Sequence, residues 1–348
     1  MKIQTTIENL YNYKTYLQIE RLVHEFFEKN NYLKVDLPVL SPSLIPESYL
    51  EVFETEFDYF NKREKLYLTP SPEIFLKRLL VAGIGNCYYL GRAYRNSEPN
   101  SDWHSPEFTM LEFYKLGVNY LEMADIVLEL LKSINKQLRI TNDEFKKIRN
   151  PKSVINNQII YQDKTISFRK WEKFSVAEAF EKFAGIKEKE LFNEKLFFKK
   201  AKEKGYNVDN PNYEDLFSQI LATEIEPKLG KNGYPTLLFD YPKQMASLAK
   251  LNEDGKTAQR CEFYINGLEI GGFCTELNDY NEQQKRFISE AKKRKKNKLI
   301  NHTIDKGFIE ALKYGLPFCT GAGIGFERLA MIFANVDSID KLKLINIS

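Results

Sequence analysis

Two neighbouring strand-like segments constrain the fold of this chain more than any other feature. Residues 87–94 and 107–116 are rich in aromatic and aliphatic side chains, and the polar loop 96–105 joins them. Further strand-like runs lie at 236–239 and 261–272, and amphipathic helical patterns lie before and between the strands. Neighbouring strands with flanking helices predict an α+β fold built on an antiparallel sheet.

The middle of the chain differs in composition from the segments around it. Residues 135–235 are rich in lysine, glutamate and asparagine, with helical patterns at 176–183 and 213–225 and no obvious catalytic cluster. We interpret this range as a helical insertion within one catalytic domain that spans residues 1–348.

Composition excludes several classes of protein. An apolar share of 43% supports a hydrophobic core, and no apolar run has the length of a membrane span. The first residues lack the apolar core of a signal peptide, so we expect a cytoplasmic protein without membrane contact. The four cysteines form no CxxC pair and only three histidines occur, which argues against disulfides and a histidine-rich metal centre.

The charges are balanced except in one run. The chain has 51 basic and 48 acidic residues, a net charge of +3, which is too balanced for a surface that binds nucleic acid without selectivity. Residues 292–298, with the sequence KKRKKNK, are the concentrated basic run. Such a run is either a solvated helix end or a docking patch for an acidic partner.

The side chains of segment 107–116 predict a binding pocket. Because side chains alternate across a strand, Phe108, Met110, Glu112 and Tyr114 share one face. A carboxylate among aromatic and apolar neighbours is typical of a pocket floor, on which Phe108 stacks a planar base and Glu112 receives a cationic group. A structural ion pair at Glu112 is the alternative.

Two glutamates of a predicted hairpin form a candidate metal site. The dipeptide Asn266-Gly267 is a strong signal for a two-residue turn, which pairs Tyr264 with Glu269. Glu262 then lies on the same face as Glu269, as its diagonal neighbour. Two carboxylates there repel each other, and a bridging Mg²⁺ that carries nucleotide phosphates relieves the repulsion. The alternative is two solvated glutamates on an exposed face.

Two further features suit a polyanionic ligand. Arg95 lies where the strand at 87–94 meets the polar loop, and the arginine fork binds phosphate or carboxylate through two hydrogen bonds. The glycine-rich segment 321–325 lets the backbone approach a ligand closely, and Arg328 lies at the start of the helix that follows. The spacing is not that of a P-loop.

Together these segments resemble the class II aminoacyl-tRNA synthetases, specifically their lysine branch. The helical pattern at 13–29 and the strand that ends before Pro38 are similar to motif 1, the dimer-forming element. Residues 94–98 with 104–112 are similar to motif 2, and residues 321–328 to motif 3. The resemblance implies the class II catalytic core and a homodimer.

Within the lysine branch, the chain is most similar to the elongation factor P–lysine ligase family. The segments that carry this resemblance are 69–73 with 77–80, 106–112, 244–248, 282–287 and 309–317. The motif 1 helix begins at about residue 13, so we expect no anticodon-binding domain.

The resemblance implies a two-step ligase that uses ATP and Mg²⁺. It would activate lysine or β-lysine as an adenylate and transfer the acyl group to a lysine side chain of elongation factor P, with tRNA not expected as an acceptor. Two alternatives stay open. One is a truncated lysyl-tRNA synthetase-like enzyme that acylates tRNA or another acceptor, and the other is a catalytically silent regulatory paralogue.

The resemblance also assigns roles around the nucleotide. Arg95 would hold the α-phosphate and the attacking carboxylate, and Arg328 would hold the terminal phosphates, so both are catalytic candidates. Glu98 and His104 would contact ATP, and Phe108 would stack on its adenine.

Further roles concern the metal and the amino acid. Glu262 and Glu269 would bind Mg²⁺. The residues that would surround the amino acid, with their carboxylates toward its side-chain ammonium, are Glu73, Glu112, Tyr114 and Glu276.

Two departures from the family pattern affect the amino-acid end of the site. Gly323 occupies a position where the elongation factor ligases tend to have alanine and the tRNA synthetases glycine. Residues 272–274, Gly-Phe-Cys, replace the family's Asn-Gly-Phe before the last pocket glutamate. The choice between α-lysine and β-lysine therefore stays open.

Overall fold

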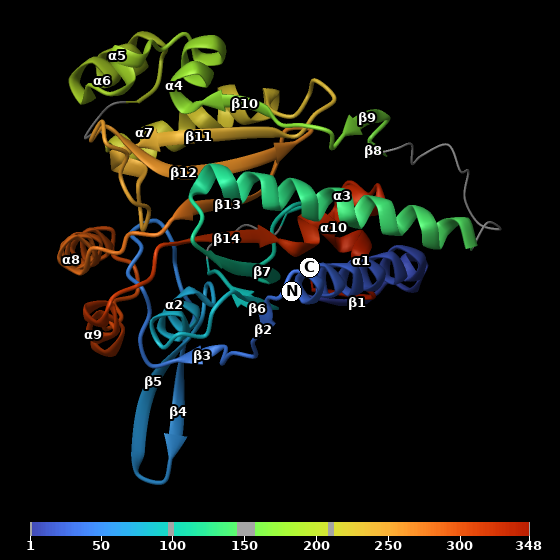
Figure 1. The fold of residues 1–348 in the computed structure, drawn as a ribbon. Helices are drawn as coiled ribbons and strands as arrows, with labels where there is room; N and C mark the ends of the chain where they lie inside the picture. The colour runs from blue at the N-terminus through green and yellow to red at the C-terminus, as the bar shows by residue number, and fades with distance from the viewer. Residues whose placement is uncertain (1, 97–100, 145–156, 208–211, 348) are drawn as a thin grey trace. The chain divides into compact units, whose positions relative to one another are not determined.

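The computed structural model describes the backbone of residues 2–96, 101–144, 157–207 and 212–347 (Figure 1). The chain divides into two compact units, Met1–Val118 with Glu276–Ser348, and Asn119–Thr275. Each unit is described in turn. The organisation into a single catalytic domain stays a prediction.

The first unit has four main strands in the order β14-β7-β6-β2. They are β2 (Leu33–Lys34), β6 (Cys87–Tyr94), β7 (Glu107–Leu116) and β14 (Cys319–Gly325). β7 pairs antiparallel with both β6 and β14, whereas β2 pairs parallel with β6. The predicted strands at 87–94 and 107–116 are therefore confirmed.

The described residues of this unit form the α-helices α1 (Leu10–Lys29), α2 (Glu73–Val81), α8 (Tyr280–Lys296), α9 (Lys306–Tyr314) and α10 (Phe326–Ala334). The helical pattern at 13–29 is confirmed by α1, which buries Ile19, Leu22, Val23 and Phe27. The Phe27 ring stacks on Tyr88 of β6 with 4.6 Å between centroids, which holds α1 against the sheet.

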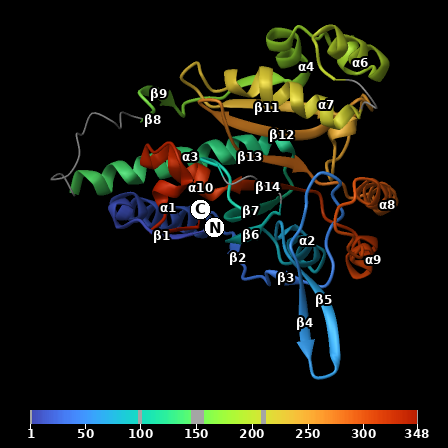
Figure 2. The same ribbon diagram turned by 180° about the vertical axis from the view of Figure 1, so that it is seen from behind.

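Smaller sheets also occur among the described residues of the first unit. β3 (Leu40–Ser41), β5 (Lys62–Leu68) and β4 (Glu54–Tyr59) pair in the order β3-β5-β4, and the β4–β5 hairpin projects from its unit in both views (Figures 1 and 2). β1 (Ile3–Thr5) pairs antiparallel with β15 (Ile345–Ile347), so the two ends of the described chain lie side by side.

Where the structure describes the second unit, its main strands lie in the order β10-β11-β12-β13. They are β10 (Glu172–Ser175), β11 (Thr236–Pro242), β12 (Thr257–Ile265) and β13 (Leu268–Thr275). β10 runs parallel to β11, and the remaining pairs are antiparallel. Alternation of helices with mainly antiparallel strands confirms the α+β class.

The range 135–235 contains strands as well as helices. Its helices are the end of α3 (Tyr120–Glu144), α4 (Val176–Ala179), α5 (Glu188–Leu191), α6 (Glu194–Glu203) and α7 (Tyr213–Ile220). The predicted helical segments are confirmed, and π-helical turns at Phe180–Ala184 and Leu221–Ile225 extend α4 and α7. The sequence pattern did not indicate β10 or the hairpin of β8 (Gln158–Tyr161) and β9 (Lys164–Ser167), because four-residue strands carry little periodicity.

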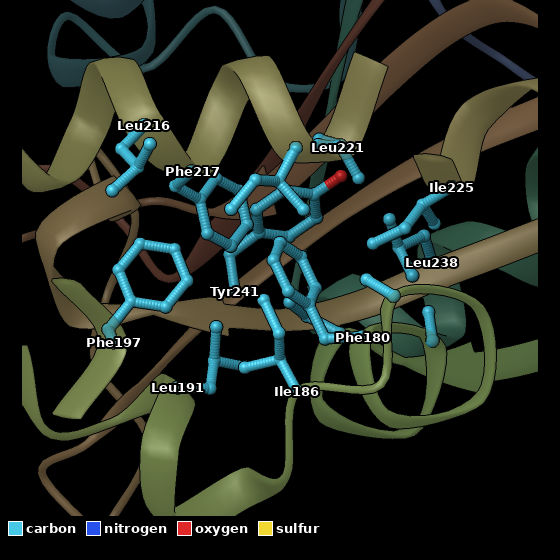
Figure 3. Packing of buried hydrophobic residues seen from close by; sticks show 14 of the residues in the cluster. Phe180, Ile186, Leu191, Phe197, Leu216, Phe217, Leu221, Ile225, Leu238 and Tyr241 are labelled. Atoms are coloured by element: carbon cyan, nitrogen blue, oxygen red, sulfur yellow. The ribbon is translucent and has the colours of Figure 1, made fainter. Parts of the chain in front are cut away.

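An aromatic cluster fixes these helices on β11 (Figure 3). The rings of Phe180 and Phe217 stack with centroids 4.8 Å apart, and both pack with Leu238 and Tyr241 of β11. This core holds the strand that carries Tyr241, a residue that contacts Glu262.

Short 3-10 turns lie at Ile7–Asn9, Glu226–Lys228, Lys243–Met245 and Ile339–Leu342. Among the described residues, no helix combines the length and the apolar character that a membrane crossing requires.

Candidate active site

β7 and β14 form the floor of the candidate site. Opposite residues of an antiparallel pair share a face. Gly321 lies opposite Tyr114, and Gly323 lies opposite Glu112. A Cβ on Gly321 would come within 2.5 Å of Glu276 Oε1 and of Tyr114 Cε1, so only glycine fits there without displacing them. A Cβ on Gly323 would meet no atom within 4 Å, so space is open beside Glu112.

Three carboxylates gather at this floor around one ammonium. Lys77 Nζ lies 2.6 Å from Glu276 Oε2, and it forms a second ion pair with Glu73, one turn earlier on α2. Tyr114 Oη donates a hydrogen bond of 3.0 Å to Glu112 Oε1. The carboxylates outnumber the Lys77 ammonium among the described residues of this cluster, so the cluster attracts a further cation.

The ionisation of Glu112 reflects this environment. Burial raises the pKa of Glu112 well above its ordinary value, and the Glu73 carboxylate raises it further. The hydrogen bond from Tyr114 and the charge of Lys77 act in the opposite direction. Lys77 forms ion pairs with Glu73 and Glu276, and Glu112 accepts from Tyr114, an arrangement that suits a pocket carboxylate at Glu112.

Arg95 and Phe108 are neighbours. Arg95 follows the last residue of β6, and its Cζ lies 5.2 Å from the centroid of the Phe108 ring, within the range of a cation–π contact. Arg95 N also donates to Pro106 O at 2.9 Å, which holds the two ends of the connecting loop together. The structure thus places the residues expected to hold the α-phosphate and the adenine side by side.

Arg328 and His104 also meet. Arg328 Nη2 lies 2.7 Å from His104 Nε2, and Arg328 Nε donates to Trp103 O at 3.0 Å. An arginine only donates, so Nε2 accepts and the histidine proton is on Nδ1, 3.0 Å from Ser101 Oγ. Two of the residues expected to contact ATP are therefore in direct contact with each other. Glu98 lies outside the described residues.

Glu327 anchors the helix that carries Arg328. Both of its carboxylate oxygens accept from Thr109 N at 2.9 Å, and burial raises the pKa of the Glu327 carboxyl group. This contact ties α10 to β7. The sequence pattern did not indicate the contact between Glu327 and Thr109. It also did not indicate that Lys77 pairs with the pocket glutamates, although Glu73 and Lys77 have the i, i+4 spacing of a helical ion pair.

The predicted hairpin is present in the second unit. Asn266 and Gly267 have φ angles of 53° and 84°, as a type I′ turn requires, and Tyr264 pairs with Glu269. A β-bulge follows this pair, so Glu262 lies opposite a residue one position further along β13 than a regular ladder would give.

Glu262 is held by three donors. Its Oε2 accepts from Tyr241 Oη at 2.5 Å and from Tyr264 Oη at 2.7 Å, and its Oε1 accepts from Arg260 Nη2 at 2.6 Å. Burial raises the pKa values of both tyrosines well above the ordinary value, so both hydroxyls stay protonated and donate. A solvated Glu262 is excluded, since this residue is only 9% exposed, whereas Glu269 is half-buried.

The residues Glu262 and Glu269 suit a magnesium ion whose remaining ligands are phosphate oxygens and water. A carboxylate has about four acceptor positions, and the three donors leave Glu262 one. Among the described residues, no group of three or more His, Cys, Asp or Glu side chains is arranged to hold a metal ion. Nucleotide-bound Mg²⁺ commonly takes one or two carboxylates and completes its shell with phosphate oxygens and water, which this pair allows.

Comparison with known proteins gives the family of the chain. The family described as tRNA synthetases class II (D, K and N) matches residues 6–345. A relative in Buchnera aphidicola subsp. Schizaphis graminum, named elongation factor P–(R)-beta-lysine ligase, is 35% identical over 326 residues, which cover 92% of this chain and 90% of the relative. A relative of the same name in Vibrio cholerae is 33% identical, with 92% of this chain and 91% of the relative covered.

A lysine–tRNA ligase is a further relative. The enzyme of Carboxydothermus hydrogenoformans is 31% identical over 325 residues, which cover 92% of this chain but 62% of the relative. Both kinds of relative thus match 92% of this chain.

Proposed function

Since this chain belongs to the class II tRNA synthetase family (D, K and N), we propose that it is an ATP-dependent ligase that activates lysine or β-lysine and transfers it to elongation factor P. The acyl group would pass to a lysine side chain of that factor. The observation that carries the proposal is the cluster of Glu73, Glu112 and Glu276 around Lys77, a buried site whose charge suits a side-chain ammonium. The relatives named for this reaction cover most of the chain and support the choice of acceptor.

In the first step a carboxylate oxygen of the amino acid attacks the α-phosphorus of ATP. A P–O bond forms, the bond to the pyrophosphate oxygen breaks, and an acyl-adenylate results. Arg95 would hold the α-phosphate and the attacking carboxylate, Phe108 would stack on the adenine, and Arg328 with His104 would hold the terminal phosphates. These groups act by position and charge rather than by forming covalent bonds. Glu98 is proposed as a further ATP contact.

Magnesium belongs to the second unit in this proposal. Glu262 and Glu269 would hold the ion, and Tyr241, Tyr264 and Arg260 orient the Glu262 carboxylate. When bound, Mg²⁺ would neutralise phosphate charge.

In the second step the ε-amine of the acceptor lysine attacks the acyl carbon. An amide forms, AMP leaves with the electrons of its bond to carbon, and the amine loses a proton. Part of the basic run suits an acidic acceptor, because Lys292, Lys295, Lys296 and Lys298 are exposed. We further propose a cytoplasmic homodimer that does not acylate tRNA.

A second candidate function is acylation of tRNA or another acceptor by a lysyl-tRNA synthetase-like enzyme. It is favoured by Gly323, which leaves open space beside Glu112 and matches the tRNA synthetase pattern at this position. A catalytically silent paralogue is disfavoured, because Arg95, Arg328 and the glutamate cluster are all in place.

Pyrophosphate exchange tests the activation step. The protein is incubated with ATP, labelled pyrophosphate and one amino acid at a time. We expect lysine or β-lysine to support exchange and other amino acids to be inert. Exchange driven by another amino acid, with both lysine isomers inert, would exclude the proposed substrate.

A further inference from the structure

A buried arginine lies within the lysine-rich end of α8. The Arg294 side chain is 2% exposed, whereas the neighbouring Lys295 is exposed. Arg294 Nη1 donates to Glu47 O at 2.7 Å and also to Leu50 O, and its Nη2 donates to Ile300 O at 2.7 Å. A guanidinium ion in the interior needs such acceptors, and its planar fork reaches several at once. Arg294 is therefore not part of the solvated basic surface.

Apart from Ile300 O, the acceptors of Arg294 described here lie on one short segment, residues 47–51. Arg294 Nη2 lies 3.2 Å from Glu51 Oε1, and the Glu51 carboxylate also accepts from Ile300 N at 3.1 and 3.2 Å. Ser48 N donates to Glu290 Oε2 at 3.0 Å, one turn before Arg294 on α8. The end of α8 thus holds both the backbone of this segment and the Glu51 side chain.

Segment 47–51 also contacts Asn96, the neighbour of the proposed ATP contact Arg95. Asn96 N donates to Glu51 O at 3.0 Å, and Asn96 Nδ2 donates to Val52 O at 3.3 Å, in an isolated antiparallel bridge. Asn96 directly follows Arg95. Burial and the charge of Glu73 raise the pKa of Glu47, and Arg95 acts against them, so the Glu47 carboxyl group also lies near Arg95.

We propose that Arg294 is a positioning residue for ATP, which holds segment 47–51 against Asn96 and thereby sets the position of Arg95. The inference deepens the proposed function, because it takes Arg95 as the phosphate contact. The guanidinium of Arg294 donates to acceptors at residues 47, 50, 51 and 300, so its effect on the nucleotide would pass through the segment and through Arg95.

A double-mutant cycle on ATP affinity tests this coupling. Arg294→Met keeps the length of the side chain and removes its donors. We expect it to weaken ATP binding, measured by calorimetry without amino acid, about 3- to 30-fold, the range found for mutations that act through a contact network. Arg294→Lys should recover part of the loss. Lys285→Met, at an exposed position of the same helix, should leave the affinity unchanged.

The decisive comparison uses an Arg95→Ala background. If Arg294 acts through Arg95, Arg294→Met causes no further loss of ATP affinity there. An equal loss in both backgrounds would assign Arg294 a general structural role, and an unchanged affinity in the wild-type background would contradict the proposal outright. If Arg294→Met does not fold, Glu51→Gln replaces it in the double-mutant cycle with Arg95→Ala, because this substitution removes only the charge of one acceptor.

Amide hydrogen exchange supplies a second readout. Arg294→Met should increase exchange at Asn96 N and Ser48 N, while Lys285→Met should not. Neither measurement needs turnover, so an enzyme that fails to activate lysine would count against the proposed function and leave the coupling testable.

Discussion

Lys77 Nζ lies 2.6 Å from Glu276 Oε2, and each of these side chains is only 2% exposed. The ion pair is part of a cluster in which one ammonium faces three carboxylates. Lys77 therefore balances only part of the negative charge of the pocket. We propose that a substrate ammonium offsets part of the remaining negative charge, which would favour a lysine-like side chain.

This cluster makes lysine binding dependent on pH. Burial and Glu73 raise the pKa of Glu112, so below that raised pKa the carboxyl group of the free enzyme is protonated. An ammonium favours the ionised form, so binding releases a proton in that range and lysine affinity rises with pH up to the raised pKa. Above it the affinity is constant until the substrate amine itself titrates, at a pKa of about 10.

The measurement is calorimetric titration of lysine across pH in buffers of different ionisation heat, with wild type and Glu112→Gln. The variant carries no titratable group at this position and should show weaker binding with no proton release below the raised pKa. Proton release by the variant equal to that of the wild type would exclude Glu112 as the source.

The two arginines should each be essential for activation. Losing one charge-assisted contact to a phosphate in a closed site costs about 10²- to 10³-fold in rate, so Arg95→Ala and Arg328→Ala should each reduce lysine-dependent pyrophosphate exchange by that factor. Arg63→Ala, on the projecting β4–β5 hairpin, is the matched control and should retain full exchange. If Arg63→Ala loses exchange activity, or if Arg95→Ala keeps it, the roles assigned to the two arginines are contradicted.

Glu269 should set the Mg²⁺ requirement. Glu269→Gln keeps the size of the side chain and removes one of two anionic ligands, so the Mg²⁺ concentration for half-maximal exchange should rise about 10- to 100-fold, with circular dichroism unchanged. If the variant and the wild type respond identically to Mg²⁺, the metal does not lie at this hairpin.

Gly323 should influence the choice between lysine isomers. Its Cβ position is open and lies on the face of Glu112, so Gly323→Ala adds a methyl group to the pocket without displacing a neighbour. One methyl group changes discrimination by about 10- to 200-fold, and we expect kcat/KM to shift from α-lysine toward β-lysine. An unchanged isomer ratio would remove Gly323 as the determinant and direct attention to residues 272–274.

Gly321→Ala is the contrasting variant on the same strand. Its methyl group would collide with Glu276 and Tyr114, so activity with both isomers should fall together.

The sequence predicted local geometry better than long-range contacts. The shared face of Phe108, Glu112 and Tyr114 followed from strand alternation, and the Glu269 pairing followed from the turn dipeptide, because both depend only on backbone periodicity. The donors that hold Glu262 include Tyr241, which is 21 residues away, and no local pattern indicates such a partner.

The basic run at 292–298 combines a buried arginine with exposed lysines, which the sequence alone did not separate. Periodicity in a lysine-rich helix end does not distinguish Arg294, which is buried, from the exposed lysines beside it. Only the tertiary structure shows its acceptors at residues 47–51.

Transfer to the acceptor protein tests the central claim most directly. The enzyme is incubated with ATP, Mg²⁺, either lysine isomer and elongation factor P, and the factor is weighed by mass spectrometry, with a parallel reaction that contains tRNA instead. We predict that the factor gains the mass of one lysyl residue on a lysine side chain and that tRNA gains at most a trace. Efficient acylation of tRNA with the factor left unmodified would contradict the proposed acceptor.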